Sequence, residues 1–318
     1  MSIILPFEID PISRAYHNIA FPLGIIQANL IDFNVWLSNK LVDCVYHEYD
    51  NFLSSVEPDI WSEGDKLTES QHILISPKAF NYMDIDFIPF IKSMLQNDNY
   101  FTGNYNEYYI PGKDKYHTRN NIHDYVIFGF DDDKKVFKSA GYLTENLYTF
   151  FDIPYDDYYK SLINLPSSQL WIDFFKINKD FKPQININKI KMLLTNYVNS
   201  TCSTSVPLLD SFYGISAMDK FADFVQESDE VDFRYSRVFF EHRKIMLNSF
   251  ITLAGNNFIS SSYIKIYEEI YKNSQLVHIL YMKYDITKRN KDLNKIYSLI
   301  KETNCKEHSL ITKMLKYF

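Results

Sequence analysis

The side chain best suited to chemistry in this sequence is a histidine at the start of an apolar run. His123 is followed by the apolar segment 125–130, which contains Gly129, and then by three aspartates at 131–133. Segments 125–130 and 136–138 have the pattern of two strands joined by a tight charged turn. Histidine is the side chain that most often moves protons in enzymes. We therefore expect His123 to be a general base at the mouth of a strand.

The segment around this histidine has a family resemblance. Residues 120–132 resemble the histidine strand of the bacteriocin-leader peptidases and of the butirosin-type acyltransferases, whose pattern is His, a run of branched residues, then Gly-Tyr-Asp. Phe130 replaces the Tyr of that pattern. The resemblance implies an α+β, papain-like cysteine-peptidase fold, with an N-terminal helix, an antiparallel sheet and a C-terminal helical domain.

Two further segments fit the same group. Residues 107–117 carry an acid, aromatic residues and a proline before the histidine, which is similar to members encoded beside peptide synthetases. The Gly141-Tyr142 pair also fits, and the resemblance covers most of residues 10–165. It implies a substrate-binding surface that includes Tyr16, His17, Tyr109, His117 and Tyr142.

The expected nucleophile is missing. Papain-like chemistry needs a thiolate at a helix N-terminus, where the helix dipole and an imidazole stabilise the anion. The resemblance places this thiolate within residues 13–18, and Ala15 occupies the aligned position. Either a Cys→Ala replacement has been introduced to trap a substrate, or this member has lost covalent chemistry. If the two positions form a pair, the His123 imidazole should lie within about 5 Å of the Ala15 Cβ.

A third group should orient the histidine. The resemblance places an aspartate after the hairpin, but the residue sixteen positions after His123 is Ser139. Its hydroxyl could accept a hydrogen bond from the imidazole. The aspartates at 131–133 more simply form a solvated turn.

The cysteines do not replace the missing thiol. Cys44, Cys202 and Cys305 are widely spaced and odd in number, which fits neither a disulfide framework nor a zinc site. We expect free thiols, with Cys44 in a core and Cys202 in a loop. Cys44 and His47 are an alternative pair, but in a strand these two residues would point to opposite faces.

The chain changes character along its length. Short strands and few helices are expected up to about residue 178, and helical periodicity follows residue 184. We expect a catalytic domain at 1–165 and a helical accessory domain at 166–318 that binds the carrier or the substrate. Expected front elements are a helix from Ser13 that Pro22 kinks or ends, helices at 84–94 and 156–163, and a strand at 147–151. Expected rear helices are 187–197, 208–225, 233–253, 263–284, 293–300 and 310–318.

Composition indicates a globular chain. It has 318 residues, of which 46% are hydrophobic and 23% charged, which is enough for two domains. No apolar run approaches the roughly 20 residues of a membrane span, and the first residues lack signal-peptide features. We therefore expect a cytoplasmic protein without a membrane partner.

Charge is divided unevenly between the two parts of the chain. Residues 1–160 hold 12 Lys+Arg against 24 Asp+Glu, and residues 161–318 hold 21 against 16. The balances of −12 and +5 disfavour nucleic acid and favour an acidic protein partner on the rear part. Residues 241–244 are expected to form an exposed charged helix face, and Arg237, Arg243 and Lys244 are candidates for docking an acidic carrier.

The resemblance implies amide-forming acyl transfer in secondary-metabolite biosynthesis. A cysteine would take an acyl group from the phosphopantetheine thioester of an acyl or peptidyl carrier protein and pass it to a small amine, with no bound cofactor and no metal. One alternative is a thioesterase or peptidase of the same fold, and the lack of a transporter segment disfavours a leader peptidase. Another alternative is a catalytically silent binding or scaffold protein of a biosynthetic complex.

Overall fold

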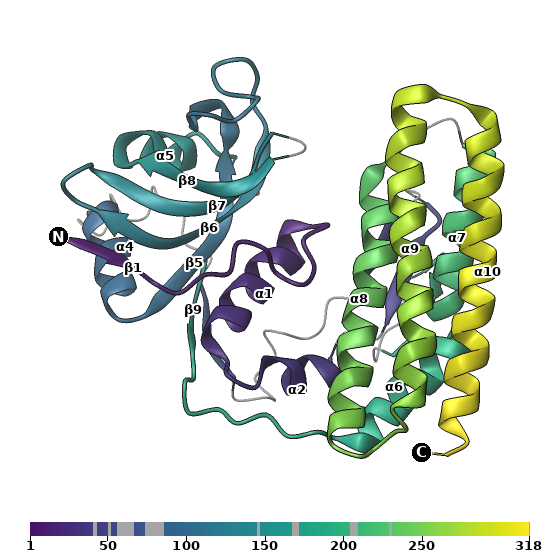
Figure 1. Ribbon diagram of the computed structural model, residues 1–318. Helices are drawn as coiled ribbons and strands as arrows, with labels where there is room; N and C mark the ends of the chain where they lie inside the picture. Colours follow the sequence, from purple (N-terminus) through teal and green to yellow (C-terminus); the bar gives the residue numbers. More distant parts are fainter. Residues whose placement is uncertain are drawn as a thin grey trace. The chain divides into compact units, whose positions relative to one another are not determined.

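The computed structural model of the chain describes residues 1–40, 43–49, 52–55, 67–73, 86–144, 147–166, 172–203, 209–228 and 231–317. The fold is mixed α and β, with antiparallel sheets and a helical C-terminal region, as the sequence predicts at this level. It has two compact units (Figure 1). The sheet unit consists of the described parts of Met1–Ile31 and Ile60–Phe181, and the helical unit of those of Asp32–Asp59 and Lys182–Phe318.

This division differs from the expected single boundary after residue 165. The segment Asp32–Asp59 belongs to the helical unit because its strands complete a small sheet there. Tyr46 pairs with Phe212, and the strand carries buried Cys44 and Val45 against the helices. The chain therefore enters the helical unit early and returns to it after residue 181.

The sheet unit is built on one antiparallel sheet of seven strands within the described residues. The strands are β1 (Ser2–Ile4), β4 (Thr68–Ile73), β5 (Asn99–Asn106), β6 (Ile122–Asp131), β7 (Val136–Thr144), β8 (Leu147–Pro154) and β9 (Ile172–Ile177). Their order is β4-β9-β5-β6-β7-β8, and β1 also pairs with β6. The helices are α1 (His17–Asn29), α4 (Phe87–Gln96), the 3₁₀ helix η2 (Glu107–Tyr109) and α5 (Tyr155–Ile163).

The predicted hairpin is confirmed as β6 and β7. Asp131 pairs with Val136, and the Asp131 carboxylate accepts the backbone N–H groups of Asp133 and Lys134, which closes the turn. Gly129 lies at an irregularity of β6 where β1 approaches closely. A Cβ there would come within 2.4 Å of the Ile3 carbonyl oxygen, so the glycine permits β1 to pair.

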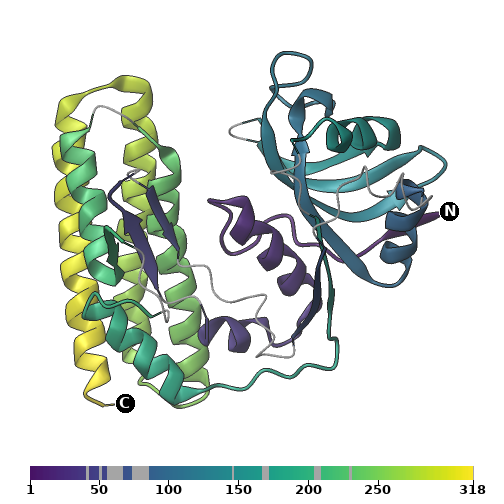
Figure 2. The same ribbon diagram turned by 180° about the vertical axis from the view of Figure 1, so that it is seen from behind.

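Helices cover both faces of this sheet. In Figures 1 and 2, α1 lies on one side and α4 and α5 lie on the other. On the α5 side, the Tyr158 hydroxyl donates to the Tyr125 hydroxyl at 2.6 Å, and both side chains are fully buried. The opposite face carries stacked Phe7 and Phe128 rings, with centroids 5.1 Å apart. The sheet therefore holds an aromatic core on each face.

The first helix begins later than the sequence predicts. Tyr16, not Ser13, is its N-cap, and its side chain makes no capping hydrogen bond. The helix also continues through Pro22 to Asn29 instead of ending there. A proline inside a helix costs about 3 kcal/mol. Burial of most α1 side chains outweighs that cost, because apolar burial contributes about 1.5–3 kcal/mol for each large side chain.

The helical unit combines long helices with a three-stranded sheet in the order β10-β2-β3. Its elements are α2 (Phe33–Ser38), β2 (Cys44–His47), β3 (Phe52–Ser55), α6 (Ile187–Val198), β10 (Ser211–Tyr213), α7 (Gly214–Glu227), α8 (Phe233–Gly255), α9 (Ser262–Thr287) and α10 (Asn290–Leu315). Residue 208, where one helix was expected to begin, lies outside the described residues. Within the described part of the chain, no helix has the length and apolar character needed to cross a membrane.

The two helices predicted at 293–300 and 310–318 are one continuous helix, α10. The sequence between them is polar, but Thr303, Asn304 and Glu307 are buried. The apolar pattern breaks there because polar side chains, instead of apolar ones, face the interior. Helical periodicity read from apolar residues alone misses such a segment.

Polar side chains meet in the centre of the helical unit. Arg243 and Glu307 are fully buried, and the guanidinium donates to the Glu307 carboxylate at 2.6 Å. The same nitrogen donates to the Asn304 side chain at 2.8 Å. The hydroxyls of Tyr197 and Tyr267 also donate to Glu307. These contacts join α6, α8, α9 and α10.

This cluster corrects the prediction for residues 241–244. Glu241, His242 and Arg243 are buried, so they do not form an exposed charged face. Arg243 cannot dock an acidic carrier, because its whole charge is used inside the unit. The prediction was wrong because four consecutive polar residues on a helix usually indicate an exposed face, whereas Arg243 finds its partner Glu307 on a distant helix.

Breaking this ion pair should destabilise the helical unit. We expect Arg243→Met to lower the free energy of unfolding by about 3–5 kcal/mol, because it leaves a buried carboxylate without its cation. The double variant Arg243→Met with Glu307→Leu should lose less, because no charge remains buried. Urea unfolding followed by far-ultraviolet circular dichroism measures both.

The matched control is Lys306→Met, which breaks an exposed pair with Glu302 on the same helix. That variant should unfold like the wild type. Equal losses for the single and double variants would mean that the buried charges do not determine the effect.

Candidate functional site

Two histidines from distant parts of the sheet unit are in contact. His17 is the first residue of α1, and His123 is the second residue of β6, opposite Tyr105 of β5. Their Nδ1 atoms are 3.0 Å apart, and the rings are nearly perpendicular at 78°. His17 is buried, whereas His123 is exposed. The start of a helix and the start of a strand therefore meet at an imidazole pair.

Aromatic rings surround the buried member of the pair. The His17 ring stacks on Phe21, one helical turn further along α1, with centroids 4.6 Å apart. It also stacks on Tyr142 at 5.4 Å, and Tyr148 lies 6.3 Å away. These apolar neighbours remove water from His17 and disfavour its charged form.

The backbone of Tyr142 fixes the other side of His17. The Tyr142 N–H donates to His17 Nε2 at 3.3 Å, and the Tyr142 hydroxyl donates to the Arg14 carbonyl at 2.9 Å. Gly141 precedes it with a φ of +150°, a conformation that favours glycine. A Cβ at Gly141 would lie 3.5 Å from His17 Nε2. That distance is an ordinary contact, so the backbone conformation of Gly141, and not the space beside the imidazole, favours glycine here.

These contacts determine which nitrogens carry hydrogen. Burial, followed by the nearby His123 and Lys113, lowers the pKa of His17 well below its usual value, so His17 is neutral near pH 7. A neutral imidazole has one N–H and one acceptor nitrogen. Because His17 Nε2 accepts from Tyr142, its Nδ1 carries the hydrogen and donates to His123 Nδ1. His123 then carries its own hydrogen on Nε2.

This arrangement changes what His123 can do. Its Nδ1 is occupied by His17, and its Nε2 presents an N–H. A general base needs an available lone pair near the proton that it takes. In this state His123 instead offers a hydrogen-bond donor, suited to a carbonyl or carboxylate oxygen.

The expected nucleophile position lies next to this pair in the chain. Ala15 is 5% exposed and comes two residues before the first residue of α1. Tyr16, a predicted binding residue, is the N-cap between Ala15 and His17. His17, which lies in the predicted segment 13–18, contacts His123. The sequence predicts that His17 binds substrate and does not occupy the nucleophile position.

The remaining predicted site residues have other partners. Ser139 is fully buried, and its hydroxyl donates to the Val126 carbonyl at 2.7 Å. Among the described residues, the orienting contact to His123 comes from His17 and not from Ser139. Tyr109 packs against Tyr108, while His117 stacks on Tyr116 with a centroid distance of 4.0 Å.

A buried lysine was missed at the sequence level. Lys113 is 5% exposed, forms an ion pair of 3.2 Å with Glu107, and donates from Nζ to the Tyr142 carbonyl. Burial lowers the pKa of Lys113, and Glu107 opposes that change. Its surroundings in sequence, Pro-Gly-Lys-Asp-Lys, read as an exposed turn. No signal in the sequence distinguishes Lys113 from Lys115 in that segment.

The cysteines are free thiols, as predicted. Cys44 is buried in β2, and its Sγ donates to the Gly214 carbonyl at 3.2 Å. Burial raises the pKa of this thiol well above its usual value, so it is a poor nucleophile. Cys202 is half-buried and Cys305 is exposed.

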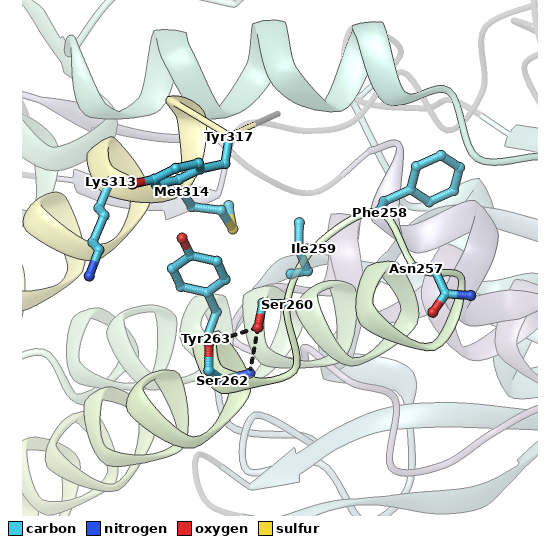
Figure 3. Close-up of a pocket in the computed structure, with 9 residues that line it drawn as sticks. All are labelled: Asn257, Phe258, Ile259, Ser260, Ser262, Tyr263, Lys313, Met314 and Tyr317. Atoms are coloured by element: carbon cyan, nitrogen blue, oxygen red, sulfur yellow. Dashed lines mark hydrogen bonds between the residues drawn. The ribbon is translucent and has the colours of Figure 1, made fainter.

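Neither of two cavities in the structure is lined by His123. One, of about 620 Å³, lies in the sheet unit beside Lys92, Asp132 and Tyr155. The other, of about 630 Å³, lies in the helical unit, where Tyr263, Met314 and Tyr317 gather (Figure 3). Among the described residues, no three His, Cys, Asp or Glu side chains are grouped to hold a metal ion.

Comparison with models of protein families finds no match to this chain, and comparison with curated proteins finds none either. The papain-like resemblance therefore depends on the residues quoted above.

The lowered pKa of His17 predicts a pH effect on stability. Below about pH 6.5 the unfolded chain binds a proton at this histidine, whereas the folded chain does not. As pH decreases, His17 should therefore lower the free energy of unfolding by at most about 1.4 kcal/mol per pH unit. In His17→Phe, urea unfolding should show a smaller loss of stability between about pH 7.5 and 5.5.

His308→Gln is the matched control, because His308 is exposed on α10. That variant should keep the wild-type dependence on pH. His278, whose pKa is lowered to about 4 mainly by burial, contributes equally to all three proteins. An unchanged slope in His17→Phe would contradict a neutral, buried His17.

Proposed function

We propose that the sheet unit is a papain-like domain that binds an acyl group without covalent chemistry. In this proposal it holds the carbonyl of a carrier-bound thioester, and the protein is a silent binding member of a biosynthetic complex. The contact between the His17 and His123 Nδ1 atoms carries the proposal. It stands where a nucleophile would have to contact the base.

The papain-like part of the proposal is supported by the order and placement of the elements. Acyl transfer by a Cys–His pair needs a helix N-terminus next to a histidine on a neighbouring strand. Here α1 precedes β6 in the chain, and the first residue of α1, His17, contacts the second residue of β6, His123. The surrounding antiparallel sheet agrees with the same type of fold.

The non-covalent part is supported by the partners of the imidazoles. A nucleophile must lie about 2.6–3.2 Å from its base. That distance from His123 Nδ1 is occupied by His17, whose own two nitrogens are both engaged. His17 is therefore not available as a nucleophile itself. The exposed Nε2–H of His123 is suited to binding an acyl oxygen.

A second function is favoured by the position of Ala15, two residues before α1. A cysteine there would make the protein an amide-forming acyltransferase. Its thiol would give its proton to His123, the thiolate would attack the thioester carbonyl, and the departing carrier thiolate would take that proton from His123. An amine would then attack the acyl-cysteine and lose its proton to His123, which frees the thiolate. Water in place of the amine would give a thioesterase or peptidase.

The two functions are separated by mixing the chain with an acyl-phosphopantetheinyl carrier protein. We expect this chain to bind the acyl form without releasing the carrier thiol above the rate in buffer. His123→Phe should weaken binding about tenfold, because one hydrogen bond to the acyl oxygen is lost. Fluorescence anisotropy measures binding, and a thiol reagent measures release.

Thiol release by the unmodified chain would contradict the binding proposal. Ala15→Cys supplies the comparison. If its thiol is alkylated by iodoacetamide well below the usual cysteine pKa of about 8.5, and His123→Ala removes this shift, the dyad of the acyltransferase proposal exists.

The carrier is also proposed to dock through basic residues of the helical unit. With Arg243 buried, Arg237 and Lys244 remain half-exposed on α8. Carrier proteins present acidic helices, so association should slow as ionic strength rises, because attraction is screened over about 10 Å at 0.1 M salt. Charge reversal at Lys244 should lower the association rate more than it raises dissociation.

Stopped-flow binding at two salt concentrations measures these rates. The control is charge reversal at Lys288, which follows the last residue of α9 and pairs with Asp285. It should have little effect on the association rate. Association that does not depend on salt would reject electrostatic docking on α8.

A further inference from the structure

We infer that Lys113 is the positioning residue of the candidate site. By holding the Tyr142 backbone, it fixes the hydrogen of His17 on Nδ1 and therefore the exposed N–H of His123 on Nε2. The use of this N–H rests on the proposed function, whereas the positioning itself is a property of the chain without ligand.

Lys113 is held inside the sheet unit by a small set of partners. Its side chain is 2% exposed, and its Nζ lies over the rings of Tyr105 and Phe151 at 5.6 and 5.2 Å. A buried ammonium is costly unless it is paired. Glu107 supplies the charge partner at 3.2 Å, and the Tyr142 carbonyl accepts from the same nitrogen. Asn121 in turn donates to Glu107 at 2.6 Å.

Tyr142 connects Lys113 to the imidazoles through its own hydrogen bonds. Its carbonyl is held by Lys113, its hydroxyl by the Arg14 carbonyl, and its N–H donates to His17 Nε2. The preceding Gly141 has no Cβ to restrict the peptide. The orientation of the N–H therefore depends on the groups that hold Tyr142 from outside. Lys113 is a charged group among them.

Lys113 also acts on His17 through its charge. The groups that face His17 are His123 from β6, Phe21 from its own helix, and Tyr142 and Tyr148 from β7 and β8. Lys113 contacts the Tyr142 carbonyl and pairs with Glu107, and its positive charge, after burial and the nearby His123, lowers the pKa of His17. Geometry and charge both favour a neutral His17 with hydrogen on Nδ1.

If Lys113 had only a structural role, a different result would be expected. Its removal would then lower stability but leave the hydrogen positions of the histidines unchanged. The tautomers of His17 and His123 are therefore the decisive measurement, because they report the site directly. They are measured in the full chain without ligand, so the result does not depend on whether a thioester binds.

The experiment is long-range proton–nitrogen correlation spectroscopy of nitrogen-15-labelled full-length protein near pH 7.5, above the usual histidine pKa of about 6.5. In the wild type, His17 should be protonated on Nδ1 and His123 on Nε2, with a scalar coupling across the two Nδ1 atoms. In Lys113→Met, both histidines should show mixed tautomers and the coupling should be lost. Glu107→Gln, which keeps the Lys113 nitrogen as a donor to the Tyr142 carbonyl, should retain the wild-type pattern.

Lys138→Met is the matched control. Lys138 lies on β7, three residues before Gly141, and pairs with Asp152 at 2.8 Å, so its loss should leave both tautomers unchanged. A folded Lys113→Met protein with wild-type tautomers would overturn the inference.

If Lys113→Met does not fold, a measurement on the wild-type protein tests the inference instead. A scalar coupling between Lys113 Nζ and the Tyr142 carbonyl carbon is expected, and its absence would overturn the inference. A failure of thioester binding with these couplings present would reject the proposed function alone.

Discussion

A backbone N–H can only donate, and the candidate site depends on that constraint. The Tyr142 N–H points at His17 Nε2, so this nitrogen must accept. Burial among aromatic rings keeps His17 neutral, which leaves one hydrogen for its Nδ1 and directs it to His123. The Tyr142 N–H thus determines that the exposed His123 presents an N–H to solvent. His123 is more than 100 residues from His17 in the chain.

Both units place a charged pair where water is excluded. In the sheet unit, Lys113 and Glu107 support the strand that carries Tyr142. In the helical unit, Arg243 and Glu307 join four helices. Desolvation makes such pairs weak sources of net stability, but removal of one partner is costly. Each pair therefore acts mainly by specifying which elements must meet. Polar neighbours make further hydrogen bonds to each pair, although Arg243 Nε has no such partner among the described residues.

The same geometry gives the functional proposal its form. A helix start beside a strand histidine is the framework that thiolate chemistry requires, yet this chain places an imidazole against that histidine. The His17 contact explains how such a strand can be kept without a nucleophile. In the proposed function, binding an acyl oxygen through an N–H would use the position of the histidine and not its basicity.

The sequence by itself determined the local elements. The hairpin of β6 and β7 and helix α5 follow from apolar alternation, helical spacing and a charged turn, all of which act over a few residues. Tertiary structure decided the early entry of Asp32–Asp59 into the helical unit, the continuity of α10, and the burial of Lys113 and Arg243. A polar residue is buried only when its partners are present, and here Glu307 is 64 residues from Arg243. Such partners are invisible to local patterns, because the chain brings them together only on folding.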